Sequence, residues 1–460
     1  MQDLAAIFED VVEASGMAGA QLSIIKGGER IDLAAELRDV GQGEPMTVET
    51  TGQVGSVTKV FNAVLVLELV ARGKLDLDEP IIRKIPELKL GDADAASKIT
   101  LRHLVSMSAG IDNGDYHYYD SLRERIENLR DLPQHHAPGE GYGYSNAATD
   151  LSGYVVERTM GRSWDDLLRE FVLDPAKLSH TTTRDAEQGD RMGRGHVLDP
   201  ATKTYHYVEK DHFSLGSAPA GSTLTSNAAD LANFGKALLD GYLDAPKSIY
   251  ARGTIQGVFT PQADVPVKTL SLEWCLGPGT LEWQGTRMWW HPGGNNRGVS
   301  MLFIIPSQNA VLACTGNTPN MGGLLNAQMT GNIFPKVFGI SPPPRPEVVN
   351  LPLAEQSRFL GTYAALMGEL HVEQRDDRLF MRNVMRLPGN VMEFGGYLDP
   401  IGPGRFWLNV DGKGGPTNLP ETYMEVALFG ADTSGRATTA VTGLCAYSRA
   451  YAESCASGSC

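Results

Sequence analysis

The chain has 460 residues, and 40 Lys and Arg against 55 Asp and Glu give a formal net charge of −15 at pH 7. A hydrophobic content of 42% with 21% charged residues is ordinary for a globular protein with a large core, which excludes disorder as the main state. The acidic balance argues against nucleic acid as a partner, because that binding requires Lys and Arg to neutralise phosphates. At about 150 residues per domain, the length predicts two or three domains.

The first residues predict an amphipathic helix, because Leu4, Ile7, Phe8 and Val11 recur at helical spacing. Acidic residues stand where a signal peptide would carry Lys or Arg. No apolar run is long enough to span a bilayer, and no Lys/Arg cluster marks a membrane-binding surface. The sequence as it stands therefore predicts a cytoplasmic protein with no membrane partner, or a periplasmic or secreted one if a signal peptide has been removed.

Five cysteines are too few for a disulfide framework, and their spacing matches no zinc pattern. Cys455 and Cys460 lie in a tail of small residues, where a frayed terminus is favoured over a loose disulfide. The histidines show no metal-ligand spacing either. The sequence predicts neither a metal nor a cofactor.

Several elements can be predicted in chain order. Residues 20–41 read as two strands joined by a Gly-Gly turn, and residues 57–72 as a helix with an apolar side. Residues 100–215 mix helical periodicity with Gly-rich loops. A capped helix follows over 226–241, and residues 288–317 form a strand–turn–strand pattern.

A proline-rich stretch marks a boundary. Five prolines within 341–353 favour an extended linker over any element interior. Beyond it, short strand-like segments separated by Asp and Gly turns predict a small barrel or sandwich over 354–460. We therefore expect a first domain over 1–340, the linker, and a second, all-β domain.

Ser56 and Lys59 begin the apolar helix. Three residues apart on a helix, they share one face, so the amine can hydrogen-bond the hydroxyl and activate it as a nucleophile. The helix N-terminus adds positive potential beside an attacked carbonyl. Ser23 and Lys26 have the same spacing but lie on a predicted strand, where they face opposite sides, so we reject them.

Two further segments carry candidate residues. Tyr144 and Asn146 follow a Pro/Gly-rich loop, where a Tyr beside an ammonium can act as a base and an Asn can bind a substrate amide. The alternative is a helix cap with the Tyr packed on the core. His291 precedes an apolar strand and is followed by Pro292-Gly293-Gly294, which lets a substrate backbone lie alongside. Its alternative is a surface turn.

Taken in order, Ser-x-x-Lys, Tyr-x-Asn and His-x-Gly resemble the serine β-lactamase and penicillin-binding-protein superfamily, nearest its class C, D-aminopeptidase and esterase branch. The connecting segments ITLRHLVSMSAGI, APGEGYGYSN and PAGSTLTSNAADLANF resemble segments of that branch. FLGTY at Phe359–Tyr363 resembles the opening of the lipocalin-like β-barrel that follows many such catalytic domains.

The resemblance implies an α/β fold: an antiparallel sheet flanked by helices, with an inserted all-helical region at about 60–215 and the active site between the two. The small barrel, which in relatives can border the active site, would follow. It also implies two-step acyl transfer. Ser56 would attack a carbonyl, Lys59 and Tyr144 would accept and relay its proton, and water would release the acyl group. The N–H groups of Ser56 and Gly294 would form the oxyanion hole, and Asn146 would hold the substrate amide.

The chain departs from the family pattern at two places. The Lys-Thr-Gly of β-lactamases reads His291-Pro292-Gly293 here, so the fixed charge that holds a substrate carboxylate is missing and β-lactamase activity is disfavoured. We include His291 and Gly293 among the substrate-binding residues, and Arg297 could supply charge nearby. The family's His-Thr-Ser-Gly reads Met107–Gly110, which removes the hydrogen bonds of its His and Thr.

The leading hypothesis is a metal-free serine peptidase or amidase that cleaves short peptides, including peptides that contain D residues. A carboxylic-ester hydrolase or acyltransferase using the same residues is the alternative. A non-catalytic penicillin-binding sensor is disfavoured, because every catalytic position is filled. The expected partner is a small peptide, amide or ester substrate, and a homo-oligomer is compatible with the sequence.

Overall fold

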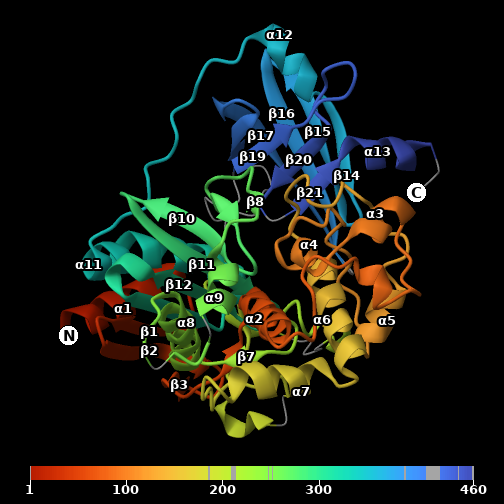
Figure 1. Cartoon of the computed structure of the whole chain (residues 1–460). Coiled ribbons are helices and arrows are strands. Elements are labelled where there is room, and N and C mark those ends of the chain that lie inside the picture. The colour runs from red at the N-terminus through yellow and green to blue at the C-terminus, as the bar shows by residue number, and fades with distance from the viewer. Residues whose placement is uncertain are drawn as a thin grey trace.

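A computed structural model shows a large antiparallel sheet covered by helices on both faces, a helical region beside it, and a closed barrel (Figure 1). The structure describes residues 2–184, 187–208, 214–246, 248–250, 252–387, 390–410, 425–443 and 445–457.

The sheet has nine strands in the order β3-β2-β1-β13-β12-β11-β10-β9-β8, and neighbouring strands are antiparallel. Its two faces follow the period of two along a strand: Phe303 and Ile305 face one cluster of apolar residues, and Leu302 and Ile304 the other. The strands are β1 Gly19–Lys26, β2 Glu29–Asp39, β3 Glu44–Pro45, β8 Ala263–Asp264, β9 Glu273–Trp274, β10 Gly279–Trp283, β11 Thr286–Gly294, β12 Val299–Ile305 and β13 Ala310–Gly316.

Helices cover both faces of the sheet. One face packs against α1, α10 and α11, and the other against α2, α8 and α9. Asn227 caps α8 by accepting a hydrogen bond from the Asp230 N–H, which confirms that this predicted helix is capped. The bounds are α1 Gln2–Ser15, α2 Thr58–Ala71, α8 Ala228–Tyr242, α9 Arg252–Phe259, α10 Gly322–Gln328 and α11 Phe334–Phe338.

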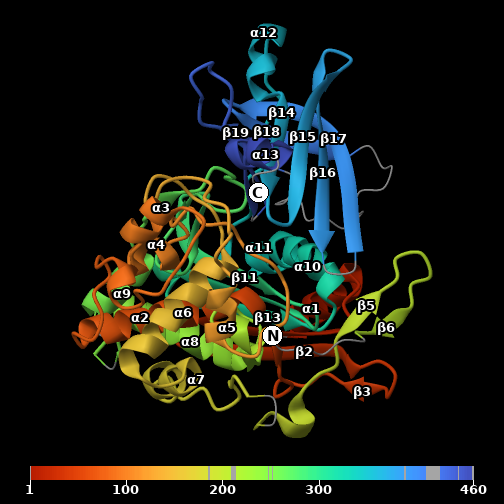
Figure 2. The same ribbon diagram turned by 90° about the vertical axis from the view of Figure 1, so that its right-hand side faces the viewer.

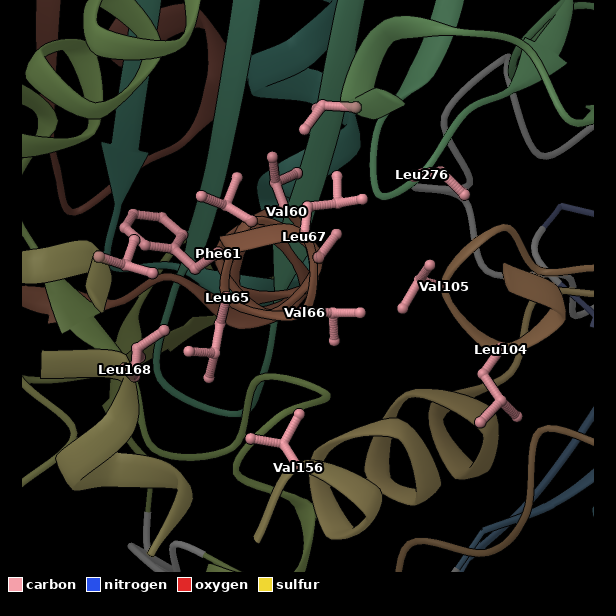
Figure 3. Close-up of a cluster of buried hydrophobic side chains, with 14 of the residues drawn as sticks. Val60, Phe61, Leu65, Val66, Leu67, Leu104, Val105, Val156, Leu168 and Leu276 are labelled. Carbon is pink, nitrogen blue, oxygen red and sulfur yellow. The ribbon is translucent and has the colours of Figure 1, made fainter. Parts of the chain in front are cut away.

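Helix α2 is the centre of the molecule. Every residue from Thr58 to Leu69 is buried, so the helix is surrounded on all sides rather than on the single apolar side expected from its sequence (Figure 3). Helices α4 Leu101–Val105, α6 Asn146–Met160 and α7 Trp164–Leu168 pack against it, and the helical region also contains α3 Ala93–Lys98 and α5 Leu122–Glu127.

The inserted region is mainly helical, but it is not all-helical as the resemblance implies. It contains a hairpin of β5 His196–Leu198 and β6 Tyr205–Tyr207. Short strands also pair its two ends, β4 Gly52–Gln53 with β7 Thr225–Ser226. These strands hold the two chain segments that enter and leave the region side by side, immediately before Ser56.

The C-terminal part forms a closed barrel of eight strands beyond the short helix α12 Leu353–Gln356 (Figure 2). Its strands are β14 Gly361–Ala365, β15 Gly368–Arg375, β16 Arg378–Leu387, β17 Asn390–Gly402, β18 Arg405–Val410, β19 Glu425–Phe429, β20 Thr439–Thr442 and β21 Cys445–Ser448, followed by α13 Arg449–Ala456.

Two buried carboxylates attach the barrel to the rest of the chain. Asp112 Oδ2, in the helical region, accepts a hydrogen bond of 3.0 Å from the Leu366 N–H. Glu425, which is 0% exposed, accepts one of 2.7 Å from the Thr269 N–H and pairs with Arg405. The barrel therefore sits in a defined position over the sheet and the helical region.

The fold class is confirmed: an antiparallel sheet flanked by helices is joined to a small all-β barrel. Cys455 is disulfide-bonded, whereas the sequence favoured a frayed tail; Cys460 lies outside the described residues. Within the described ranges, no helix is both long and apolar enough to cross a membrane, and no group of His, Cys, Asp or Glu could hold a metal ion.

Candidate active site

Ser56 and Lys59 lie where the chain enters α2. Ser56 is in the 3-10 turn Gly55–Val57, and Lys59 follows in the first turn of the helix. The Lys59 Nζ donates a hydrogen bond of 3.1 Å to the Ser56 Oγ, as their spacing predicts. The rejected pair, Ser23 and Lys26, lies on β1.

Lys59 is held by three acceptors in a site closed to water. Its side chain donates to Ser56 Oγ, to Asn146 Oδ1 at 2.7 Å and to the Ala220 carbonyl at 2.6 Å, and it is only 2% exposed. Burial lowers the pKa of Lys59 to about 7, because removal from water penalises the charged form. The amine is thereby able to accept a proton near neutral pH.

A second layer of charge lies behind Lys59. Asp150 is fully buried on α6, one turn after Asn146, and it accepts hydrogen bonds from the Ser217 hydroxyl at 3.1 Å and the Ala220 N–H at 3.3 Å. It also pairs with the buried Arg125 at 3.3 Å. Asp150 therefore fixes the segment whose carbonyl binds Lys59, and its negative charge opposes the fall in the pKa of Lys59 caused by burial.

Both interpretations of the Tyr144–Asn146 segment apply together. The Ser145 side chain caps α6 by accepting a bond from the Ala148 N–H, and Tyr144 is 4% exposed. The Lys59 Nζ nevertheless lies 4.9 Å from the centre of the Tyr144 ring, and Asn146 is bonded to the same amine. The structure thus brings Ser56, Lys59, Tyr144 and Asn146 together.

Glycine allows the end of β11 to lie directly against the Ser56 turn. A Cβ on Gly55, whose φ is +52°, would lie 2.5 Å from the Gly294 N, and one on Gly293 would lie 2.0 Å from the Val54 carbonyl oxygen. Any side chain at either position would push the strand away. This contact places the backbone of Gly294 beside Ser56, as an oxyanion hole built from their two N–H groups requires.

His291 lies beside the catalytic residues but is not among the residues that line the cavity described below. Side chains alternate along β11, so His291, like Trp289, is on the face of the strand directed to α2, and its ring centre lies 6.3 Å from that of Tyr144. It is 1% exposed and packs edge-on to Trp274, with ring centres 5.3 Å apart. Burial, with the nearby charge of Lys59, lowers the pKa of His291 to about 3, so the ring is neutral.

Arg297 is not among the residues that line the cavity at Ser56. It lies in the turn between β11 and β12, against Gly195, and lines a separate small cavity with Gln53 and Asn317. The expectation that Arg297 supplies charge beside Ser56 is therefore not supported.

A cavity of about 520 Å³ opens at Ser56, within the roughly 300–1,000 Å³ typical of small-molecule sites. We call one side of it the catalytic wall, formed by Ser56, Tyr144, Asn146, Gly293 and Gly294. We call the other side the barrel wall, formed by Asn383, Met385, Met392, Phe394, Thr442, Gly443, Cys445 and Tyr447.

Sequence reasoning missed Asp150, Ala220 and the barrel wall. A signal for Asp150 exists, since a residue four after Asn146 lies on the same helix face. Ala220 belongs to one of the family-like segments, but a backbone carbonyl leaves no mark in a sequence. The barrel wall depends on the packing of two separate parts of the chain, which no local pattern encodes.

Comparison with known proteins identifies the family of the chain. A model of the Beta-lactamase family matches residues 4–327, and the chain belongs to that family. Penicillin-binding protein 4 of Amycolatopsis lactamdurans is 27% identical over 371 residues, which cover 75% of this chain and 92% of that protein.

Solved structures resemble the chain over different lengths. The crystal structure of SurE matches with a TM-score of 0.79 at 25% identity, covering 97% of this chain and 98% of SurE. A D-stereospecific amidohydrolase from Streptomyces sp. matches with a TM-score of 0.61 at 24% identity, covering 73% of this chain and 99% of that one. The recognition from ordered motifs is confirmed: the chain is a serine hydrolase of the serine β-lactamase and penicillin-binding-protein superfamily.

Proposed function

We propose that the chain transfers the acyl part of a short peptide to Ser56 and then to water, cleaving an amide bond. The observation that carries the proposal is the contact of 3.1 Å between the Lys59 amine and the Ser56 hydroxyl, in a site where burial lowers the pKa of that amine to about 7. A neutral Lys59 can take the hydroxyl proton as Ser56 attacks.

Other residues have supporting roles in this proposal. Tyr144, beside Lys59, would relay the proton to the leaving nitrogen. The N–H groups of Ser56 and Gly294 would bind the developing oxyanion, each contributing roughly 3–4 kcal/mol to the transition state. Water would then attack the ester carbonyl, Lys59 and Tyr144 would take its proton, and Ser56 would be released with the peptide acid.

We further propose that the residue acylating Ser56 has the D configuration. The support comes from SurE, 25% identical over nearly the whole chain, whose structure has also been determined with D-Leu. The absence of charge among the described residues of the cavity disfavours a β-lactamase or a carboxypeptidase, since neither would find a cation there for its substrate carboxylate.

Ester hydrolysis or transfer to another acceptor is the second candidate, because the contacts of Asn146 fit it equally well. Asn146 Oδ1 is occupied by Lys59, which leaves the Asn146 NH₂ group to donate to a substrate carbonyl. A carbonyl is present on the acyl side of amides and esters alike. Asn146 therefore does not select an amide substrate.

Intact-mass analysis with a fluorophosphonate tests the nucleophile. We expect one adduct on the wild type and none on Ser56→Ala; an equal adduct on the variant would refute the assignment. A panel of a D-residue peptide anilide, its L epimer, a nitrophenyl ester and a chromogenic cephalosporin tests the substrate. Turnover of the ester alone would overturn the amidase proposal.

A further inference from the structure

The cavity extends well beyond the reacting groups, as far as the barrel. Residues of β16, β17, β20 and β21, together with Gly443, form the barrel wall. Ser56 and the barrel wall line the same cavity of about 520 Å³, so an acyl group attached to Ser56 can extend through it to the barrel. The barrel wall is therefore placed to contact a more distant part of the acyl group.

No described residue lining the cavity carries a charge at neutral pH, although the chain as a whole has a net charge of −15. Tyr447 and Cys445 also stay neutral, because burial raises the pKa of each group. Burying a carboxylate or ammonium without a partner is strongly unfavourable. The chemistry of the cavity thus selects an uncharged occupant.

The barrel wall combines apolar surface with one amide side chain. Met385, Met392 and Phe394 present flexible and aromatic side chains that suit apolar groups. Among them Asn383 is 1% exposed; it hydrogen-bonds Tyr447, and its Oδ1 has no partner within the described part of the chain. Leaving a buried carbonyl oxygen without a partner is unfavourable, so a ligand N–H that bonds Asn383 Oδ1 would remove that cost.

The catalytic side of the cavity offers complementary groups. Trp290 is 4% exposed, lines the cavity, and has an indole N–H without a partner among the described residues. Asn326, on α10, also lines the cavity with an unpartnered Oδ1. A fatty acyl chain would satisfy none of these groups, whereas a peptide backbone supplies donors and acceptors between apolar side chains.

We infer that the barrel wall is a subsite for an apolar, uncharged peptide several residues long, and that Asn383 accepts a hydrogen bond from one of its backbone N–H groups. The inference rests on the proposed function, because it takes Ser56 as the point of acylation. It adds the substrate class: a blocked or internal segment of apolar residues on the acyl side.

Two substrates with the same leaving group test the inference. One is N-acetyl-D-Phe p-nitroanilide, and the other is the tetrapeptide N-acetyl-Leu-Leu-Phe-D-Phe p-nitroanilide. The quantity compared is the ratio of kcat/KM for the tetrapeptide to kcat/KM for the single-residue substrate. We expect this ratio to fall about tenfold in Asn383→Leu, because the variant loses one hydrogen bond and leaves a substrate N–H unpaired. The ratio should be unchanged in Asn409→Leu, a matched control on the exposed outer surface of β18.

An ester-for-amide scan of the tetrapeptide locates the bond. Each replacement of a backbone amide by an ester removes one N–H donor from the peptide. Replacing the amide that bonds Asn383 should lower kcat/KM in the wild type but have no effect in Asn383→Leu, because that variant lacks the acceptor. Replacing acetyl by succinyl should lower kcat/KM further, because the cavity offers no countercharge. An unchanged ratio in Asn383→Leu, or the same cost of every ester replacement in both proteins, would overturn the inference.

The same peptides separate this inference from the proposed function. If the wild type turns over neither substrate, calorimetry on Ser56→Ala measures binding of the tetrapeptide without any reaction. Binding that weakens about tenfold when Asn383→Leu is added to that protein would support the subsite and refute only the proposed chemistry. No binding of the tetrapeptide would refute the subsite.

Discussion

The two walls of the cavity are built from opposite kinds of chemistry. Behind the catalytic wall, Lys59, Asp150 and Arg125 are charged or titratable groups, all buried; Asp150 pairs with Arg125 and is connected to Lys59 through the backbone of Ala220. The barrel wall has no charge among its described residues and a single amide that stands out, Asn383. The comparison shows that groups able to move a proton and groups able to choose a substrate come from different parts of the chain.

This difference has a physical reason. A buried Lys with a lowered pKa requires rigid surroundings in which its polar neighbours are held by hydrogen bonds, and α2 at the centre of the molecule provides them. Substrate selection requires only a shaped, uncharged surface, which a separate barrel can supply without disturbing those surroundings. Changes in the first wall should therefore affect the rate of acylation, and changes in the second should affect which substrate is accepted.

The largest effect is expected for Lys59→Met, which removes the proposed base. Without an acceptor for its proton Ser56 is a weak nucleophile, so kcat should fall by about 10³-fold or more on every substrate, with little change in substrate preference. Single-turnover acylation measured by intact mass checks this. The matched control is Lys26→Met, the exposed lysine of the rejected Ser-x-x-Lys pair, which should retain full activity. Equal losses in both variants would contradict the assignment.

The second prediction concerns pH. The rate should fall as pH drops through the pKa of Lys59, about 7, because a protonated amine accepts no proton. The charge of Asp150 raises that pKa, so Asp150→Asn should move the acidic limb of kcat/KM to lower pH and reduce the plateau by about tenfold through the loosened Ala220 segment.

Three groups near Lys59 enter this test. His291 is neutral over the working range because its pKa is about 3, and Arg125 stays charged. Burial raises the pKa of Asp150 to about 6, so in the wild type the acidic limb also includes the loss of the Asp150 charge, which the Asn variant removes. Asp150→Asn also takes the buried carboxylate away from Arg125. The positive charge of Arg125 then lowers the pKa of Lys59 further, which adds to the shift caused by the loss of the Asp150 charge. Asp165→Asn, at a carboxyl of α7 whose pKa burial also raises, is the control and should leave the profile in place. A limb that moves to higher pH would contradict the argument.

The sequence predicts the catalytic wall better than the barrel wall. Ser56, Lys59, Tyr144 and Asn146 belong to short motifs with fixed spacing, and local helix geometry brings each motif's residues together. His291 has the same kind of local signal and packs against Tyr144 and Trp274, but it is buried and does not line the cavity. A short motif does not show how deeply a side chain is buried.

Long-range packing limited the remaining predictions. The nine-stranded sheet pairs β1 with β13, almost 300 residues later, and composition gives no register for such a pair. The barrel was predicted from turn spacing and from FLGTY, yet its position over Ser56 depends on Asp112 and Glu425, two buried carboxylates that bind backbone N–H groups. A bond to a backbone group leaves no partner residue to recognise.

A moderate effect is expected when one of these attachments is weakened. Glu425→Gln removes the charge that pairs with Arg405 and weakens the bond to the Thr269 N–H. The barrel wall should then hold its position less well, so KM for the tetrapeptide should rise about threefold to tenfold while kcat for N-acetyl-D-Phe p-nitroanilide stays within a factor of two. Glu393→Gln, an exposed barrel carboxylate, is the control. Equal losses on both substrates would show that the barrel supports the catalytic wall as well.

The smallest effect should come from adding a charge to the barrel wall. In Met385→Lys an ammonium would line a cavity that has none among its described residues, and it would attract a carboxylate at the far end of the acyl group. A partly exposed ion pair contributes about 0.2–1 kcal/mol, so the preference for the succinyl over the acetyl tetrapeptide should rise about twofold to fivefold.

Val391→Lys adds the same charge on β17 at a side chain that is 64% exposed, and it should change the preference much less. Added salt should reduce the Met385→Lys effect through screening. Because both variants change the net charge equally, a preference that rises equally in the two would reflect general attraction to the protein surface, and the barrel wall would then have no part in selecting the substrate.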